Sequence, residues 1–237
     1  MLWSFAVTQA GFVRWQQAQA AEVEWWQNWT RLPFYRTHSF PNYWSRALTG
    51  LLGDLETLKP GVVVEIGCGP HGVVRYLFDS AQVKLGIDPL IHQFRERPSP
   101  KAQTTYAAAI GESIPVKDNS VDLVVCVNVL DHVMDADRIL GETRRLLKPE
   151  GSLVLELLTF PPVLKPFLFF DPAHTAHWTE RDLRGLIERA GFRVNASQSL
   201  RFPAELTWRS VFTPAHWKYA FGKAFLRLSW MDCSRGL

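Results

Sequence analysis

The sequence predicts an α/β fold in which a mostly parallel sheet is covered by helices on both faces. Two observations carry this prediction. Short runs of apolar and β-branched residues alternate with amphipathic helical patterns from about residue 59 onward, as expected for buried parallel strands joined by helices. The first of these runs ends in the glycine-rich segment VVVEIGCGPHG, residues 62–72, which is typical of a strand followed by a tight turn and a helix start.

Residues 1–58 are predicted to form a helical cap region ahead of the sheet. A first helix extends to about Arg36, and its tryptophans recur at helical spacing, which favours an aromatic stripe docked onto the core or a partner chain over a substrate-facing wall. The connector THSFPNY then leads into a second amphipathic helix. The tryptophans are Trp15, Trp25, Trp26 and Trp29, and the second helix carries Trp44, Leu48, Leu51, Leu52 and Leu55 on one face.

Residues 59–200 are predicted to form the core domain, in which strands and helices alternate. The turn KPEG, residues 148–151, ends one helix, and Thr179 with Asp182 matches the pattern that caps the start of another. The expected strands are 62–66, 83–88, 104–109, 121–127, 152–158 and 192–196, and the expected helices are 72–79, 136–147 and the one that follows Thr179.

Two segments do not fit a simple sheet and helix alternation. Residues 159–178 are too long and too rich in proline and aromatic residues for a plain connection, so we expect a lid or binding loop. Residues 201–237 form an aromatic and basic extension. We expect it to be a helix packed across the domain, and contact with an anionic membrane surface is the alternative.

Composition narrows the class of protein. The chain of 237 residues is 47% hydrophobic and 21% charged with a formal net charge of +3, which is ordinary for a globular protein and too little charge to indicate nucleic acid. The three cysteines show neither metal spacing nor a disulfide framework. The amino terminus makes a poor signal peptide, and no apolar run reaches the length of a spanning helix. We therefore expect a cytoplasmic protein, either a monomer or a homodimer.

The glycine-rich segment and the second strand together indicate a nucleotide-like cofactor. Gly67, Gly69 and Gly72 allow a sharp turn and a close backbone approach to a ligand. Asp88 ends the second strand, where its carboxylate can accept hydrogen bonds from both hydroxyls of a ribose. A structural turn with Asp88 as a helix cap is the alternative.

Five segments together resemble the class I S-adenosylmethionine-dependent methyltransferases, and in particular the small-molecule enzymes among them. They are VVVEIGCGPHG, LGIDP, SIPVKDNSVDLVVCVNVLDHV, RILGETRRLLKPEGSLVL and HWTERDLRGLIERAGF, within residues 59–195. The resemblance implies a Rossmann-like, doubly wound sheet of seven strands with S-adenosyl-L-methionine as the cofactor and S-adenosyl-L-homocysteine as the product.

The resemblance also implies a set of cofactor-binding residues. Glu65 would organise the methionine end, and Asn128 would border the methionine and the sulfonium. Where the family often has an aspartate that meets the adenine amino group, this chain has Ile110, so adenine recognition would fall to backbone groups of 110–112 or to the Glu112 carboxylate. The full set is Glu65, Gly67, Cys68, Gly69, Asp88, Pro89, Ile110, Gly111, Glu112, Asn128 and Val129.

A hydroxyl acceptor would require a base, and histidine is the usual choice near neutral pH. His132 follows the strand that borders the cofactor, whereas His174 and His177 end the lid-like insertion. These three are the candidate catalytic residues, with a cap or an ordinary polar contact as the alternative. Asp171, His174 and His177 could also be read as a metal triad, but their short spacing on an irregular loop argues against it, and we expect no metal. Asp131 either pairs with a neighbouring histidine or caps the next helix.

The predicted function is methyl transfer to a small or medium-sized acceptor, most simply at a hydroxyl oxygen. The segment NVLDH lacks the signature of enzymes that methylate nucleic-acid bases. Carbon or oxygen methylation of a quinone, isoprenoid or lipid-like acceptor is an alternative, suggested by VLKPFLFF. From other classes, an NAD(P)-dependent oxidoreductase and a cofactor-binding protein without turnover remain open. Glu65 argues against the oxidoreductase, because a carboxylate there would crowd a diphosphate.

Overall fold

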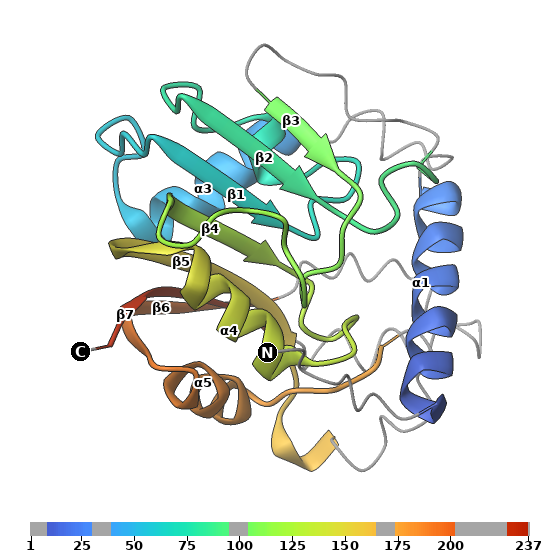
Figure 1. Cartoon of the computed structure of the whole chain (residues 1–237). Helices are drawn as coiled ribbons and strands as arrows, with labels where there is room; N and C mark the ends of the chain where they lie inside the picture. Colours follow the sequence, from blue (N-terminus) through green and yellow to red (C-terminus); the bar gives the residue numbers. More distant parts are fainter. Residues whose placement is uncertain (1–8, 30–38, 95–103, 165–173, 202–226, 237) are drawn as a thin grey trace.

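The computed structural model describes residues 9–29, 39–94, 104–164, 174–201 and 227–236. Within these residues, seven strands form one sheet in the order β3-β2-β1-β4-β5-β7-β6 (Figure 1). The helices and strands are α1 (Gln9–Trp29), α3 (Phe40–Leu52), β1 (Val62–Ile66), η1 (Val73–Arg75), β2 (Val83–Ile87), β3 (Thr104–Ala107), β4 (Val121–Val127), α4 (Ala136–Leu146), β5 (Leu147–Thr159), α5 (Glu180–Arg189), β6 (Phe192–Arg201) and β7 (Arg227–Arg235).

The sheet separates two layers of helices, as the sequence predicts. Strand β7 runs antiparallel to both of its neighbours, and the other paired strands are parallel. Because successive side chains of a strand point to opposite faces, Val63 packs in the cluster of α3, whereas Val64 packs in the cluster of α4 and α5. Figure 1 shows α4 and α5 on one face of the sheet and α3 on the other. The predicted doubly wound, seven-stranded fold is confirmed.

The predicted helix at 72–79 is wrong, because this stretch forms only the single 3₁₀ turn η1. Strands β1 and β2 are parallel, so the chain must return the length of a five-residue strand, about 16 Å. After η1, residues 76–82 form turns and irregular backbone instead of continuing as a helix. Phe78, at a φ of 59°, also interrupts any helical path.

The predicted helix in the carboxyl-terminal extension is wrong for its described part, because Arg227–Arg235 is strand β7 within the sheet. It pairs with β5 on one side and β6 on the other, so this part of the extension belongs to the core sheet. Leu228 and Trp230 are buried in the α3 cluster, and Met231 and Cys233 are buried in the opposite one. Residues 202–226 of the extension lie outside the described residues.

Several predicted boundaries shift by a few residues. Helix α3 begins at Phe40, inside the predicted connector, with Pro41 in its first turn, where a missing N–H costs nothing. Strand β5 begins at Leu147, so the predicted KPEG turn is part of a longer strand with an irregular register against β4. Strand β6 continues to Arg201 rather than ending at 196. The capping box at Thr179 is present, with the Thr179 hydroxyl accepting from Asp182 N.

Helix α1 lies across the carboxyl ends of the parallel strands (Figure 1). The predicted aromatic stripe does not form as a unit, because Trp25 is 44% exposed whereas Trp26 packs against the small cluster of Cys68, Leu90, Ile91 and Phe94. Trp15 stacks on Phe12 of the same helix. The side chain of Trp29 lies outside the described part of the structure. Docking of α1 therefore depends on Trp26 and on the polar contacts described below.

The described ends of the 159–178 insertion lie against each other. Thr159 forms a parallel bridge with Trp178, and Phe160 N donates to Trp178 O at 2.9 Å. The insertion therefore leaves β5 and returns to the start of α5 at one point beside the sheet. Residues 165–173, including Asp171 and most of VLKPFLFF, lie outside the described residues, so the predicted lid stays a prediction.

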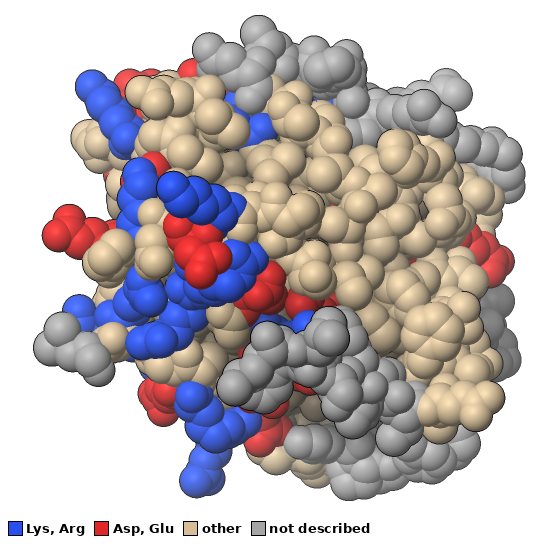
Figure 2. Space-filling view, in the orientation of Figure 1, with Lys and Arg blue, Asp and Glu red and all other residues tan. Residues whose placement is uncertain are grey.

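Lys and Arg side chains on the face shown in Figure 2 gather with acidic ones on the side away from α1. Among the described residues, Arg145 forms ion pairs with Glu142 and Asp118. The part of this face next to α1 shows mainly uncharged atoms where its residues are described. None of the described helices has the length and apolar character needed to cross a membrane.

Candidate functional site

The candidate site lies where the strand order reverses, between β1 and β4. The chain runs from β1 to β2 and β3 on one side and from β4 to β5 on the other, and ligands of open α/β sheets bind at the carboxyl ends of the strands at such a point. The glycine loop follows β1 here. Gly67 N and Cys68 N both donate to Ile87 O, at 2.7 and 3.1 Å, which fixes the loop against the end of β2.

Two glycines of the loop have the left-handed backbone that their residue type allows. Gly67 has a φ of 66° and Gly69 a φ of 49°. A Cβ at Gly67 would lie under 3.0 Å from Val129 Cγ2, so the loop and the segment after β4 pack directly against each other. A Cβ at Gly69 would lie 3.7 Å from Trp26 of α1, which is ordinary contact. The predicted loop residues are therefore brought together with Val129 and covered by α1.

Glu65 is buried at the end of β1 and closes the start of η1. Its two oxygens accept from Val73 N at 2.8 Å and Val74 N at 2.9 Å. Burial raises the pKa of Glu65 to about 8, and the two N–H donors act against that shift. A diphosphate needs free N–H groups at a helix start, and here Glu65 occupies them, which disfavours the oxidoreductase alternative.

Asp88 is held beside the same loop. Its Oδ2 accepts from Gly69 N at 2.9 Å and its Oδ1 accepts from Leu90 N at 2.7 Å. Burial raises the pKa of Asp88 to about 6, and the charge of Glu22 on α1 contributes to the same direction. Each carboxylate oxygen has a further lone pair, so both can accept from a ribose. Pro89, which follows, is partly buried.

The segment after β4 has an unusual backbone conformation. Asn128 is exposed and has a φ of 54°, a region that residues other than glycine seldom adopt and that clusters at functional sites. Its N–H donates to Glu156 O at 2.9 Å, and His132 N then closes a turn on Val129 O at 2.8 Å. The turn places His132 three residues after Val129, the residue that packs against Gly67.

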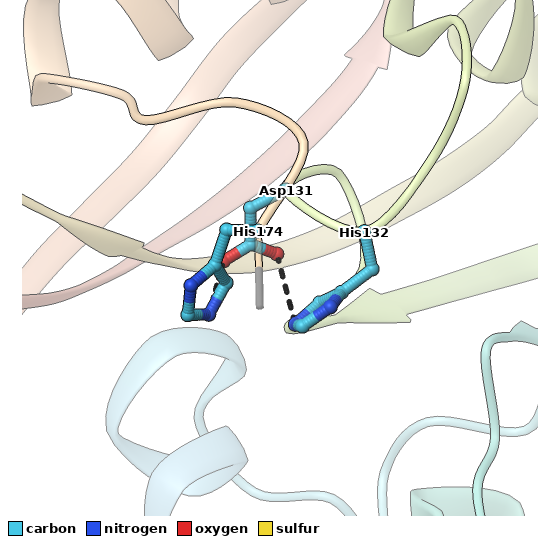
Figure 3. A group of neighbouring side chains, drawn as sticks. All are labelled: Asp131, His132 and His174. Atoms are coloured by element: carbon cyan, nitrogen blue, oxygen red, sulfur yellow. Dashed lines mark ion pairs between the residues drawn. The ribbon is translucent and has the colours of Figure 1, made fainter. Parts of the chain in front are cut away.

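Asp131, His132 and His174 form a cluster at this end of β4 (Figure 3). His132 Nε2 lies 3.7 Å from Asp131 Oδ1, and His174 Nε2 lies 3.7 Å from Asp131 Oδ2. Asp131 is buried, and both histidines are partly buried. Of the two alternatives predicted for Asp131, the structure has it beside neighbouring histidines, at 3.7 Å from each. Asp135, not Asp131, is the N-cap of α4.

Thr175 fastens the two chain segments that carry the cluster. Its N–H and its hydroxyl both donate to Asp131 O, at 2.6 and 2.9 Å, and the hydroxyl also lies 2.7 Å from Val133 O. Helix α1 adds two contacts from outside, since Arg14 donates to His174 O and Gln19 donates to His132 O, each at 3.1 Å. The cluster is therefore braced on both sides.

His177 lies beside this cluster without belonging to it. Its ring contacts those of Phe160 and His174, with centroids 5.6 and 5.8 Å apart. The alternative metal triad of Asp171, His174 and His177 includes a residue outside the described part of the chain. Within the described residues, the group whose atoms are close enough to share an ion is Asp131, His132 and His174, which sequence reasoning did not assemble.

Residues 110–112, the segment predicted to recognise adenine, pack against the loop before α4. Glu112 is buried, and its Oε1 accepts from Met134 N at 2.9 Å and Asp135 N at 3.2 Å. A Cβ at Gly111 would lie 2.7 Å from Ile139 Cδ1, so this glycine is required by packing against α4. Ile110 is partly buried. The carboxylate of Glu112 therefore has a structural partner already.

Glu156 is a buried acid near the site that sequence reasoning missed. It lies on β5 opposite Trp230, and its Oε1 has no hydrogen-bond partner among the described residues. Burial raises the pKa of Glu156 to about 8, with the charge of Asp131 acting in the same direction. The available signal was an acid within the apolar run SLVLELL. The contacts of Arg14 and Gln19 had no comparable signal, because they join segments more than 100 residues apart.

Comparison with known proteins shows that part of the chain is similar to methyltransferases. Residues 64–155 match the family model described as a methyltransferase domain. A probable S-adenosylmethionine-dependent methyltransferase of Mycolicibacterium smegmatis is 29% identical over 65% of this chain and 60% of its own length. A malonyl-[acyl-carrier protein] O-methyltransferase of Pseudescherichia vulneris is 28% identical over 46% of this chain and 44% of its own length. The chain spans about half the length of several curated relatives that it matches.

A solved structure with the same fold covers most of the chain. A protein of Galdieria sulphuraria, described as a putative sarcosine dimethylglycine methyltransferase, aligns with a TM-score of 0.63 at 16% identity over 83% of this chain and 85% of that one. The matched family model spans β1 to β5, including the glycine loop, Asp88 and the end of β4. Residues 64–155 are therefore a methyltransferase domain of the class I S-adenosylmethionine-dependent type, and the cofactor of such domains is S-adenosyl-L-methionine.

Proposed function

We propose that this protein transfers the methyl group of S-adenosylmethionine to a hydroxyl oxygen of a small or medium-sized acceptor bound beside Asp131, His132 and His174. One observation carries the proposal. A buried carboxylate with two imidazoles next to it lies at the carboxyl end of β4, one turn after the residue that packs against the glycine loop. Such a cluster can take a proton from a hydroxyl acceptor.

On the cofactor side, Asp88 accepts from the ribose hydroxyls, and the backbone of Gly67, Cys68 and Gly69 lies against the methionine part. Glu65 positions this loop through Val73 N and Val74 N rather than by touching the ligand. Burial also raises the pKa of the Cys68 thiol, so Cys68 stays a neutral packing group. Met134 N and Asp135 N both donate to Oε1 of Glu112, so adenine would be recognised by backbone groups of 110–112 or by the other oxygen, Oε2.

On the acceptor side, the chain orients the nucleophile, takes up its proton and excludes water. The sulfonium supplies an electrophilic methyl group when the cofactor is bound. In-line attack then requires that the acceptor oxygen be held at about 3 Å, for which positioning accounts for most of the rate gain. Helix α1 contacts both halves of the site, through Trp26 at the glycine loop and through Arg14 and Gln19 at the cluster. It is placed to exclude solvent from the transfer step.

A second candidate is carbon or oxygen methylation of a lipid-like acceptor. Exposed apolar side chains near the site favour it, since Phe12, Val13 and Trp25 of α1 are each more than 40% exposed and Val163 at the start of the insertion is 71% exposed. The Pseudescherichia vulneris relative is named for transfer to oxygen, which supports an oxygen acceptor for both candidates.

A panel of acceptors with homocysteine release as the readout tests the proposal. Phenols, hydroxy acids, carboxylates, amines and prenylated or acylated acceptors are compared, with and without Zn²⁺, on the native protein and on His132→Gln, His174→Gln and His177→Gln. A hydroxyl acceptor should react, and a variant of the proton acceptor should keep its S-adenosylhomocysteine affinity while turnover falls by about 10²-fold or more. If only amines react, or if every histidine variant matches the native rate, the proposal is wrong.

The same panel separates the remaining alternatives. Turnover confined to prenylated or acylated compounds supports the lipid-like acceptor. A protein that binds S-adenosylhomocysteine but releases no homocysteine with any acceptor class or with cell extract behaves as a cofactor-binding protein without turnover. Because cofactor affinity is measured on each variant, loss of turnover through misfolding is distinguished from loss of the proton acceptor.

A further inference from the structure

The histidine cluster contains polar atoms that the described part of the protein leaves without partners. Oδ1 of Asp131 and both ring nitrogens of His132 are buried and accept or donate no hydrogen bond there. A buried polar group without a partner is destabilising, and a native protein seldom retains several at one point unless they bind something. The 3.7 Å separations from Asp131 to the two imidazoles are longer than hydrogen bonds, so these groups do not satisfy one another.

The same separations suit a shared metal ion. An ion bound at about 2.1 Å by two ligand atoms in tetrahedral geometry holds those atoms about 3.4 Å apart. The Asp131 to His132 and Asp131 to His174 separations are both 3.7 Å, but they involve different carboxylate oxygens, Oδ1 for His132 and Oδ2 for His174. With one ligand atom from each residue, all three atoms lie within 4.8 Å of one another. Figure 3 shows the two imidazole rings beside the Asp131 carboxylate, one near each of its oxygens. Side-chain shifts of about 1 Å would bring the three ligand atoms to the separations of a shared site.

We infer that Asp131, His132 and His174 bind one divalent transition-metal ion of the zinc or cobalt type, with at least one coordination position open. Two imidazoles and one carboxylate are a donor set that suits these ions, whereas calcium and magnesium prefer a shell of oxygen ligands. Three protein ligands leave room for a water molecule or an oxygen of a substrate. The inference concerns metal binding and does not depend on which acceptor is methylated.

The backbone around the cluster is organised before any ion binds. Thr175 joins the Asp131 segment to the His174 segment through three contacts to backbone carbonyls. Arg14 and Gln19 of α1 hold the carbonyls of His174 and His132 from the other side. Little order therefore has to be gained on binding, which favours affinity.

A metal ion bound to this cluster prevents the histidine nitrogens that bind it from taking up a proton. A nitrogen lone pair that binds a metal cannot accept a proton, so His132 and His174 are ligands in metal-loaded protein and candidate proton acceptors in metal-free protein. His177 lies outside the cluster and remains available in both states. The two forms should therefore be measured separately in any assay of turnover.

The test is titration of metal-stripped protein with Co²⁺ and with Zn²⁺. The visible absorption of Co²⁺ reports bound ion and its geometry, and calorimetry reports affinity and stoichiometry. The variants are Asp131→Asn, His132→Gln and His174→Gln, with His92→Gln as the matched control because His92 is exposed and lies outside the cluster. Circular dichroism and S-adenosylhomocysteine affinity check that each variant is folded.

Native protein and His92→Gln should bind about one ion per chain, and each cluster variant should weaken binding by about tenfold or more while keeping its affinity for S-adenosylhomocysteine. Absence of Co²⁺ and Zn²⁺ binding by folded native protein would overturn the inference. Equal binding by the native protein and the three cluster variants would also overturn it, because the ion would then bind elsewhere. Neither result bears on methyl transfer, which the acceptor panel tests.

Discussion

Replacement of Gly67 by alanine tests the packing of the cofactor loop against the segment after β4. At a φ of 66° an alanine costs about 1–2 kcal/mol relative to glycine because of its Cβ. The new Cβ would also lie under 3.0 Å from Val129 Cγ2, and overpacking of this kind costs about 1–3 kcal/mol. We therefore expect Gly67→Ala to lower the free energy of unfolding by about 2–5 kcal/mol and to weaken S-adenosylhomocysteine binding.

Two matched variants separate the backbone cost from the steric cost. Gly69 has a φ of 49°, and a built Cβ there meets only ordinary contacts at 3.7 Å, so Gly69→Ala reports the backbone cost in urea unfolding. Val129→Ala removes both methyl groups that the new Cβ at position 67 would meet and leaves the Val129 Cβ at 3.3 Å. In the Val129→Ala background, Gly67→Ala should cost only about as much stability as Gly69→Ala, and cofactor affinity should partly recover.

Urea unfolding and calorimetric titration with S-adenosylhomocysteine measure the two effects on the same samples. The reasoning is refuted if Gly67→Ala destabilises no more than Gly69→Ala. It is also refuted if the loss caused by Gly67→Ala is the same in the native and the Val129→Ala backgrounds, since the two sites would then be uncoupled.

Three further predictions concern other buried groups of the site. Burial raises the pKa of Glu156 to about 8, so as pH rises the Glu156 carboxyl ionises in the unfolded chain before it ionises in the folded one. The free energy of unfolding should therefore fall between about pH 4.5 and 8. Glu156→Gln should reduce this fall by at least about 1 kcal/mol, measured by urea unfolding at each pH. Glu65→Gln can accept from only one of the two N–H groups at η1, so stability should drop by about 1–3 kcal/mol and cofactor affinity should drop with it in calorimetry. Thr175→Val removes a hydroxyl that braces the histidine cluster and should weaken Co²⁺ binding, whereas Thr57→Val, which removes an exposed hydroxyl in a turn, should leave Co²⁺ binding unchanged.

The sheet was predictable wherever strands are buried on both faces. Strands β1 and β4 match their predicted bounds because each consists of β-branched and apolar residues with a single acidic one. Strand β7 was not recognised, because serine and aspartate interrupt its apolar residues and basic residues flank it. Its place in the sheet is fixed by long-range pairing with β5 and β6 rather than by a local pattern.

The contrast between local sequence patterns and long-range contacts also explains which parts of the site could be predicted. The cofactor residues Gly67, Gly69 and Asp88 lie close in sequence, and the order of strand, turn and strand brings them together. The acceptor-side cluster joins Asp131 to His174 across 43 positions, and only the contacts of Thr175 reveal that these segments meet. A helix at 72–79 was predicted from its apolar residues, whereas only the turn η1 forms and the left-handed backbone of Phe78 interrupts a helical path.

The central claim is that the glycine loop and Asp88 bind the adenosine of S-adenosylmethionine, and calorimetric titration with S-adenosylhomocysteine tests it most directly. Native protein should bind at micromolar concentration and give no heat with NAD. Asp88→Ala should lose at least about tenfold in affinity, since a hydrogen bond to a charged group contributes about 1.5–3 kcal/mol. Asp122→Ala is the matched control, because Asp122 also accepts from a backbone N–H but lies at the amino end of β4, and its affinity should stay native. Folded native protein that binds NAD but not S-adenosylhomocysteine, or an Asp88→Ala variant with native affinity, would contradict the claim.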